Sequence, residues 1–94
     1  MPRQPAAARL YFVRGRVQGV NFRNYTQLVA SELGLTGYVR NLDDGRVEVY
    51  ACGPPDKLSA LSGALRKGPR FAEVRGVEEQ EAEWHQYSFF QIEI

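Results

Sequence analysis

The sequence predicts an α+β protein in which two helices lie on one face of a mostly antiparallel sheet. Three observations carry this prediction: strand-like stretches alternate with two stretches of helical spacing, an Asp-Gly turn joins two strands, and the length of 94 residues suits a single domain. Hydrophobic residues make up 44% of the chain and charged residues 24%, which is typical of a globular protein.

The chain is expected to begin with a strand and a helix. Residues 10–14 are nearly all apolar and include Tyr, Phe and Val, which favours a strand inside a sheet rather than at its edge. Residues 22–33 have the apolar spacing of a half-buried helix, and Gly34 is a natural residue to end it. The expected buried stripe consists of Phe22, Tyr25, Val29 and Leu33.

A hairpin and a second helix follow. The strand candidates 35–42 and 46–52 flank the turn Asp43-Asp44-Gly45, which predicts an antiparallel hairpin. Pro54-Pro55-Asp56 suits the first turn of a helix, and Gly68-Pro69 stops that helix. The buried stripe expected for the second helix consists of Leu58, Leu61 and Leu65.

The last quarter of the chain is strand-like again. Residues 71–83 have a strand pattern in which Gly76 marks a bulge or bend. Phe90, Ile92 and Ile94 alternate with polar residues in a final strand. The order is therefore β-α-β-β-α-β with an extra strand at the end. This order predicts a ferredoxin-like α+β sandwich with a four- to five-stranded sheet and both helices on one face.

Composition narrows the classes of function. The net charge is +1, so overall charge gives no reason to expect nucleic acid or a membrane surface as a partner. The single cysteine, Cys52, suits a reducing compartment, and no apolar run is long enough to span a membrane. Residues 1–8 are expected to be a loose tail without signal-peptide features, and residues 9–94 a single cytoplasmic domain.

The sequence has few residues for metal, nucleotide or histidine-based chemistry. With one histidine, His85, and one cysteine, neither a zinc site nor a histidine triad is expected. No nucleotide-binding glycine motif is present. The glutamates at positions 78, 79, 81 and 83 are interpreted as a solvated face. We therefore expect neither a metal nor a cofactor.

A glycine-containing loop is expected between the first strand and the first helix, in Gly15-Arg16-Val17-Gln18-Gly19-Val20. Its glycines permit unusual dihedrals, and backbone N–H groups at the start of a helix bind anions. Arg23 follows in the first helical turn, where the helix dipole disfavours a cation. A bound phosphate would remove this mismatch, because Arg23 would bind it in addition to the backbone N–H groups. The planar guanidinium of arginine matches two phosphate oxygens at once. The plainer alternatives are an ordinary turn and an arginine that points into solvent.

Asn41 is the second candidate site residue. It lies near the end of an expected strand, in Gly37-Tyr38-Val39-Arg40-Asn41-Leu42, although asparagine is disfavoured within strands. Asparagine is common where strands end and turns begin, so an ordinary turn former remains an alternative for this stretch alone.

Together these stretches resemble the acylphosphatase family. The resemblance rests on the loop at 15–20 and on Phe22-Arg23, Gly37-x-Val39-x-Asn41, Asp44-Gly45-x-Val47-Glu48 and Phe90-x-Ile92. It covers nearly the whole chain after the tail. Two positions depart from the family pattern: Asn21 stands where many relatives have glycine, and Tyr38 where many have tryptophan. We expect Asn21 to alter the entry into the helix or to cap it, and Tyr38 to change packing.

The resemblance implies a small monomeric enzyme that hydrolyses acyl phosphates to a carboxylate and inorganic phosphate. It implies that N–H groups of residues 15–20 bind the phosphoryl oxygens, that Arg23 grips the same phosphate, and that Asn41 positions the attacking water. No metal or covalent intermediate is implied. Few catalytic groups suffice for this chemistry, because a carboxylate with a pKa near about 4 leaves without a general acid and the transition state is loose.

Two other functions are alternatives. Ferredoxin-like sheets also bind RNA, but residues 46–52 lack the glycine-aromatic signature of such sheets. A non-catalytic phosphate- or partner-binding module of the same family is the second alternative. Met1 and the presence of both Arg23 and Asn41 favour a free-standing enzyme. Arg14, Arg16 and Arg40 either attract anionic substrates or are solvated charges.

Overall fold

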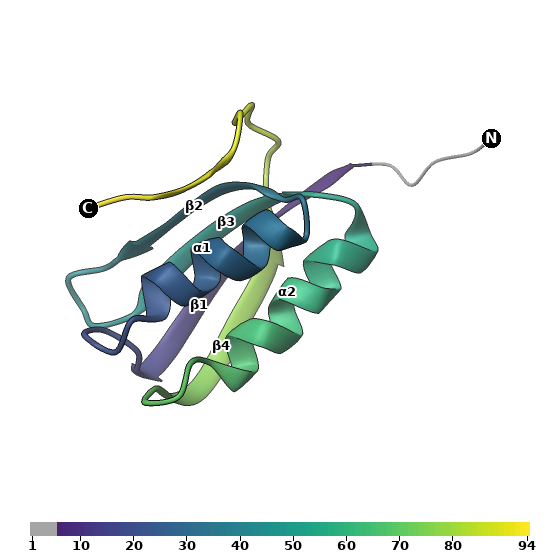
Figure 1. The fold of residues 1–94 in the computed structure, drawn as a ribbon. Helices are drawn as coiled ribbons and strands as arrows, with labels where there is room; N and C mark the ends of the chain where they lie inside the picture. Colours follow the sequence, from purple (N-terminus) through teal and green to yellow (C-terminus); the bar gives the residue numbers. More distant parts are fainter. Residues whose placement is uncertain (1–5) are drawn as a thin grey trace.

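Five strands form one sheet, and two helices lie side by side on one of its faces (Figure 1). This computed structural model describes residues 6–94. The elements in chain order are β1 (Ala7–Arg16), α1 (Phe22–Glu32), β2 (Thr36–Asn41), β3 (Val47–Gly53), α2 (Pro55–Lys67), β4 (Glu73–Glu81) and β5 (Phe90–Ile92). The predicted ferredoxin-like α+β fold, including the extra final strand, is confirmed.

The strand order β4-β1-β3-β2-β5 determines which chain segments meet at each end of the sheet. Both β1 and β2 pair antiparallel with β3, so β1 and β2 run in the same direction, and β5 pairs parallel with β2. The carboxyl ends of β1, β2 and β5 therefore lie at the same end of the sheet. Val13 of β1 and Asn41 of β2 flank Val47 of β3 there.

The core lies between the sheet and the two helices. All seven residues of β3 are buried, as suits the central strand, and α2 buries Leu58, Leu61 and Leu65 as predicted. The buried stripe of α1 is Phe22, Thr26 and Ala30, so the prediction for this helix was only partly right. Thr26 is buried because its hydroxyl donates to the Phe22 carbonyl at 2.9 Å, which satisfies the polar group within the helix. Val29 and Leu33 are half-buried beside this stripe.

Two glycines allow strands to bend or approach closely. The pairing of β1 with β4 shifts between Arg14 and Gly15, which leaves Arg75 as an extra residue and confirms the bulge expected beside Gly76. A side chain at Gly76 would collide with the Arg14 guanidinium, which lies across the backbone there.

The ends of the first and last strands differ from expectation. β1 begins at Ala7, and Ala8 is buried opposite Cys52, so the last two residues of the expected tail are paired strand residues. Ala6 precedes β1 and is exposed, and the rest of that prediction, for residues 1–5, lies outside the described residues. At the other end, Ile94 lies beyond β5 and is fully exposed, because β5 forms only the short pairing with β2.

A smaller aromatic cluster covers the sheet face opposite the helices. The Tyr38 and Tyr50 rings stack there with centroids 5.6 Å apart, and Tyr87 packs against both. The Tyr50 hydroxyl donates to the Glu83 carbonyl and accepts the His85 N–H, which fastens the β4–β5 connection to this face. Tyr38 therefore acts in packing on the side of the sheet away from α1.

Candidate active site

A cavity of about 180 Å³ opens where the carboxyl ends of β1, β2 and β5 meet the start of α1. It is smaller than the 300–1,000 Å³ typical of sites for drug-sized ligands, and therefore suits a small ligand group. The lining residues are Val17, Gly19, Asn21, Phe22, Arg23, Asn24, Asn41 and Ile92. Of the eight residues predicted for the site, Val17, Gly19, Arg23 and Asn41 line this cavity.

The loop from residue 15 to residue 20 is held against the protein on one side and open on the other. Val17 is buried in the core, and Val20 packs against it. Gly19 has a φ of 74°, and a side chain there would meet no other atom within 4 Å. The backbone N–H groups of residues 18–21 donate to no acceptor among residues 6–94. These groups and the first amides of α1 are thus free for an anion.

The remaining predicted loop residues do not line the cavity. Gly15 has a φ of 125° and lies against the Glu73 carbonyl, so glycine is required there by the close approach of β4. Arg16 is exposed at the end of β1, opposite Glu73. Gln18 directs its side chain to the β2–β3 hairpin, where its Nε2 atom donates to the carbonyls of Leu42 and Arg46.

Asn21 forms the junction between the loop and α1. Its φ of 70° and ψ of 21° place it in the left-handed region, which glycine adopts most easily and asparagine tolerates. The expected helix cap is wrong: the Asn21 side chain accepts a hydrogen bond from Asn24 Nδ2 at 2.7 Å and makes no cap bond. The left-handed backbone explains why glycine is suited to this position.

Arg23 lies in the first turn of α1, as predicted, and its side chain is half-buried. Its Nη1 atom donates to the Glu93 carbonyl at 3.4 Å, a long bond that leaves most of the guanidinium donors for other partners. The first turn of α1 contains no acidic residue. The positive helix end and the guanidinium charge therefore add up at the cavity.

Asn41 contributes a polar atom that the protein leaves unsatisfied. Its Oδ1 is buried and finds no hydrogen-bond partner among residues 6–94. An unmade hydrogen bond of this kind costs about 1–3 kcal/mol, and such groups in native proteins often have a functional reason. Because Asn41 and Arg23 line the same cavity, a carboxamide and a cation reach a small ligand there together.

Sequence reasoning missed four lining residues, of which Asn21 was expected only to shape the entry into the helix. Ile92 reaches the cavity from β5 only because that strand pairs with β2, and no local pattern reveals this pairing. Asn24 lies three residues after Asn21 and is exposed. No motif in the sequence marks an exposed helix residue of this kind as part of a site. Phe22 was expected as a core residue and is both core and cavity wall.

The arrangement is that of an anion-binding site. Gly19 and Asn21, whose backbone N–H groups have no acceptor among residues 6–94, line a small cavity with the start of α1, Arg23 and Asn41. Within residues 6–94, no group of three or more His, Cys, Asp or Glu side chains is placed to hold a metal ion. In the same part of the chain, neither helix has the length and apolar character needed to cross a membrane.

Comparison with known proteins identifies the family. A model of the acylphosphatase family matches residues 9–92. The acylphosphatase of Solibacter usitatus is 62% identical over 88 residues, which cover 94% of this chain and 92% of that protein. A solved acylphosphatase from Coxiella burnetii has a TM-score of 0.91 at 40% identity, covering 94% of this chain and 93% of its own. One from Bacillus subtilis also scores 0.91, at 35% identity, with 96% and 100% covered. The chain belongs to the acylphosphatase family.

Proposed function

We propose that this protein hydrolyses the carboxyl-phosphate bond of acyl phosphates, releasing a carboxylate and inorganic phosphate. The free amides of the 15–20 loop and of the first turn of α1 bind the phosphoryl oxygens, and the Arg23 guanidinium clamps the same group. The observation that carries the proposal is the shared cavity: Arg23, Gly19 and Asn41 line one small volume, and the buried Asn41 Oδ1 has no hydrogen-bond partner among residues 6–94.

Asn41 positions the attacking water in this proposal. A carboxamide both donates and accepts hydrogen bonds, so it can orient a water molecule without removing its proton. Phosphoryl transfer through a loose transition state needs little nucleophilic activation, and orientation supplies much of the rate. The Arg23 charge and the amide groups then stabilise the negative charge on the transferred phosphoryl oxygens.

The reaction proceeds without a metal ion or a covalent intermediate. A carboxylate is a good leaving group, with a conjugate acid pKa near about 4, so neither a general acid nor a Lewis acid is needed to expel it. The test is the hydrolysis of acetyl phosphate by the purified protein with and without EDTA. We expect equal turnover in both, and loss of activity on chelation would contradict the metal-free mechanism.

Location and assembly complete the proposal. We place the protein in the cytoplasm as a monomer, with no nucleic acid, membrane or cofactor as partner. Its one cysteine, Cys52, is buried and forms no disulfide, which suits a reducing compartment. Sedimentation equilibrium at micromolar concentration tests the assembly: a mass of 10.6 kDa is expected, and about twice that value would contradict it.

A non-catalytic phosphate-binding module is the alternative. It predicts the same binding of inorganic phosphate and no turnover, so the acetyl phosphate assay separates the two functions. The unpartnered Asn41 Oδ1 supports the enzyme, because a free acceptor can receive a hydrogen bond from an attacking water.

A further inference from the structure

The Gln18 side chain connects the phosphate loop to the β2–β3 hairpin. Its Nε2 atom donates both of its protons, one to the Leu42 carbonyl at 2.8 Å and one to the Arg46 carbonyl at 2.9 Å. A carboxamide nitrogen has two N–H donors, so none remains for a ligand. Both donors of the Gln18 side chain therefore hold the hairpin, while its backbone N–H faces no protein acceptor among residues 6–94.

The two carbonyls that Gln18 binds lie on either side of the turn between β2 and β3. Leu42 N–H donates to the Arg46 carbonyl at 2.8 Å, and Gly45 N–H donates to the Leu42 carbonyl at 3.2 Å. Leu42 directly follows Asn41, whose carboxamide borders the cavity. The bond from Gln18 to Leu42 thus reaches the chain one residue from the group that positions water in the proposed function.

We infer that Gln18 is a positioning residue for hydrolysis: its carboxamide fixes the distance and angle between the phosphate loop and Asn41. The loop carries the phosphate and the strand end carries the water, so their relative placement sets the line of attack. Both halves are attached to the core separately, the loop through Val17 and Asn41 through its pairing with Val47. Among residues 6–94, the hydrogen bonds that join the loop directly to the hairpin are the two that Gln18 makes. This inference rests on the proposed function of Asn41.

Loss of this bond should leave the fold intact. Each of the two carbonyls keeps a backbone donor, Gly45 N–H for Leu42 and Leu42 N–H for Arg46, so neither becomes an unsatisfied buried group. Gln18→Met retains the length and shape of the side chain and removes its donors. A misplacement of reacting groups by about 1 Å can cost about 100-fold in rate. We expect Gln18→Met to lower kcat about 10- to 100-fold, with KM and the inhibition constant of inorganic phosphate within about threefold of the parent.

Gln18→Glu provides a second variant with a distinct pH profile. Its carboxylate faces two carbonyl oxygens and donates nothing, whereas the protonated carboxyl restores one donor. The activity of Gln18→Glu relative to the parent should rise as the pH falls through the pKa of the introduced group. Gln18→Met should show no such rise. Gln80→Met, an exposed glutamine of β4, is the matched control and should retain parental kcat.

A double-mutant cycle with Asn41→Ala distinguishes positioning from a general structural role. If Gln18 acts through Asn41, Gln18→Met should reduce kcat in the parent and have no further effect in Asn41→Ala. Parental kcat in Gln18→Met, an effect confined to KM, or an equal loss in both backgrounds would each overturn the inference. If Asn41→Ala itself keeps parental turnover, the proposed function of Asn41 fails, which is a different result from a silent Gln18→Met.

Side-chain amide NMR gives a readout that needs no turnover. In the parent, the Asn41 and Gln18 carboxamides should be ordered on the picosecond-to-nanosecond timescale. Gln18→Met should lower the order parameter of the Asn41 carboxamide while backbone order in the helices stays the same. An unchanged Asn41 order parameter would overturn the inferred positioning of Asn41 by Gln18, independently of the activity assays.

Discussion

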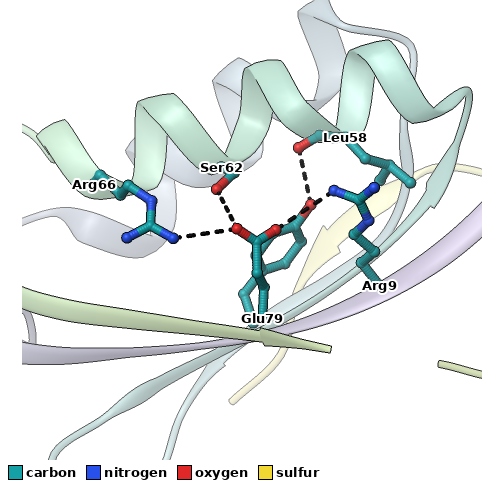
Figure 2. Close-up of polar contacts among 6 residues, drawn as sticks. Arg9, Leu58, Ser62, Arg66 and Glu79 are labelled. Carbon is teal, nitrogen blue, oxygen red and sulfur yellow. Dashed lines mark hydrogen bonds and ion pairs between the residues drawn. The ribbon is translucent and has the colours of Figure 1, made fainter. Parts of the chain in front are cut away.

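Two groups of polar side chains, one beside β4 and α2 and one at the cavity, differ in how completely they are paired. At the β4 side, the Glu79 carboxylate accepts hydrogen bonds from Ser62 at 2.9 Å, Arg66 at 3.2 Å and Arg9 at 3.5 Å (Figure 2). At the other end of the sheet, Asn41 Oδ1 finds no partner within residues 6–94. The Arg23 guanidinium there makes the long bond to the Glu93 carbonyl.

We interpret the paired group around Glu79 as contributing to stability and the unpaired group at the cavity as contributing to activity. Glu79 joins α2 to the sheet, because its partners come from β1 and α2. Since its charge is paired, it lowers the stability of the fold only slightly. The cavity residues leave donors and acceptors unused, which lowers stability and leaves these groups available to a ligand. Substitutions should therefore affect folding at Glu79 and activity at the cavity, with little crossover between the two.

The largest expected effect is the loss of activity in Arg23→Ala. An arginine that stabilises a phosphoryl-transfer transition state is worth about 10³-fold or more in rate. The same change removes a cation from the first turn of α1, so the free energy of unfolding should stay the same or rise by a few tenths of a kcal/mol to about 1 kcal/mol. Acetyl phosphate turnover and urea unfolding measure the two. Arg23→Lys is the control, because it keeps the charge and loses the planar fork.

If the free energy of unfolding of Arg23→Ala fell by more than about 1 kcal/mol, the contrast between the cavity and the group around Glu79 would be contradicted. It would mean that the guanidinium supports the fold through Glu93 rather than being held for the ligand.

The second effect is a loss of stability at alkaline pH that depends on Tyr11. Burial raises the pKa of Tyr11 to about 12, and its hydroxyl donates to the Leu58 carbonyl at 2.9 Å. Because the folded-state pKa lies above the unfolded value near 10, this stabilisation is complete below pH 10 and is lost as the pH rises toward 12. The expected slope is up to about 1.4 kcal/mol per pH unit.

Tyr11→Phe should be less stable than the parent by about 1 kcal/mol at pH 7, since it loses one buried hydrogen bond. Between pH 10 and 12 its stability should fall less steeply than that of the parent. Urea unfolding at several pH values measures both, and parallel curves for the two proteins would contradict this account.

The third effect is the destabilisation of Glu79→Ala by about 1–2 kcal/mol. The change removes two partly exposed ion pairs of small value and leaves the buried Ser62 hydroxyl without its acceptor. Thermal unfolding should shift downward by several degrees, while kcat for acetyl phosphate stays within about twofold. Glu78→Ala, on the opposite face of the same strand, is the matched control. A large loss of kcat in Glu79→Ala would contradict the claim that the group around Glu79 affects folding and not activity.

The smallest effect concerns the backbone at Asn21. Asn21→Gly and Asn21→Ala both lose the bond to Asn24, so their difference reports the left-handed conformation alone. Asn21→Ala should be the less stable of the two by about 1 kcal/mol, because a Cβ is disfavoured at a φ of 70°. Equal stability of the pair in urea unfolding would show that the loop relaxes to another conformation.

The features predicted correctly from the sequence are mostly local. The Asp-Gly turn and the leucine stripe of α2 are set by neighbouring residues, and both are as expected. Arg23 and Asn41 were assigned to the site through a resemblance in addition to local rules; both line one cavity, and their roles there stay a prediction. Thr26 was missed because its hydroxyl is satisfied inside the helix, which a pattern of apolar residues does not reveal.

The features that escaped sequence reasoning depend on pairing across the chain. Glu79 is exposed, in keeping with its interpretation as part of a solvated face, but its carboxylate also binds Ser62 and Arg66, which lie 17 and 13 residues away in sequence. Gln18 was assigned only through its backbone, since nothing local indicates that its side chain reaches Leu42 and Arg46. Such contacts follow from the sheet order, and no local pattern contains that order.

The central claim is that the cavity holds phosphate with one set of groups and directs water with another. The most direct test measures acetyl phosphate turnover and inorganic phosphate binding in Asn41→Ala under the same conditions. We predict a fall in kcat of about 100-fold or more, with the dissociation constant of phosphate within about threefold of the parent and no loss of stability. Parental turnover in Asn41→Ala, or a loss of phosphate binding equal to the loss of turnover, would contradict the claim.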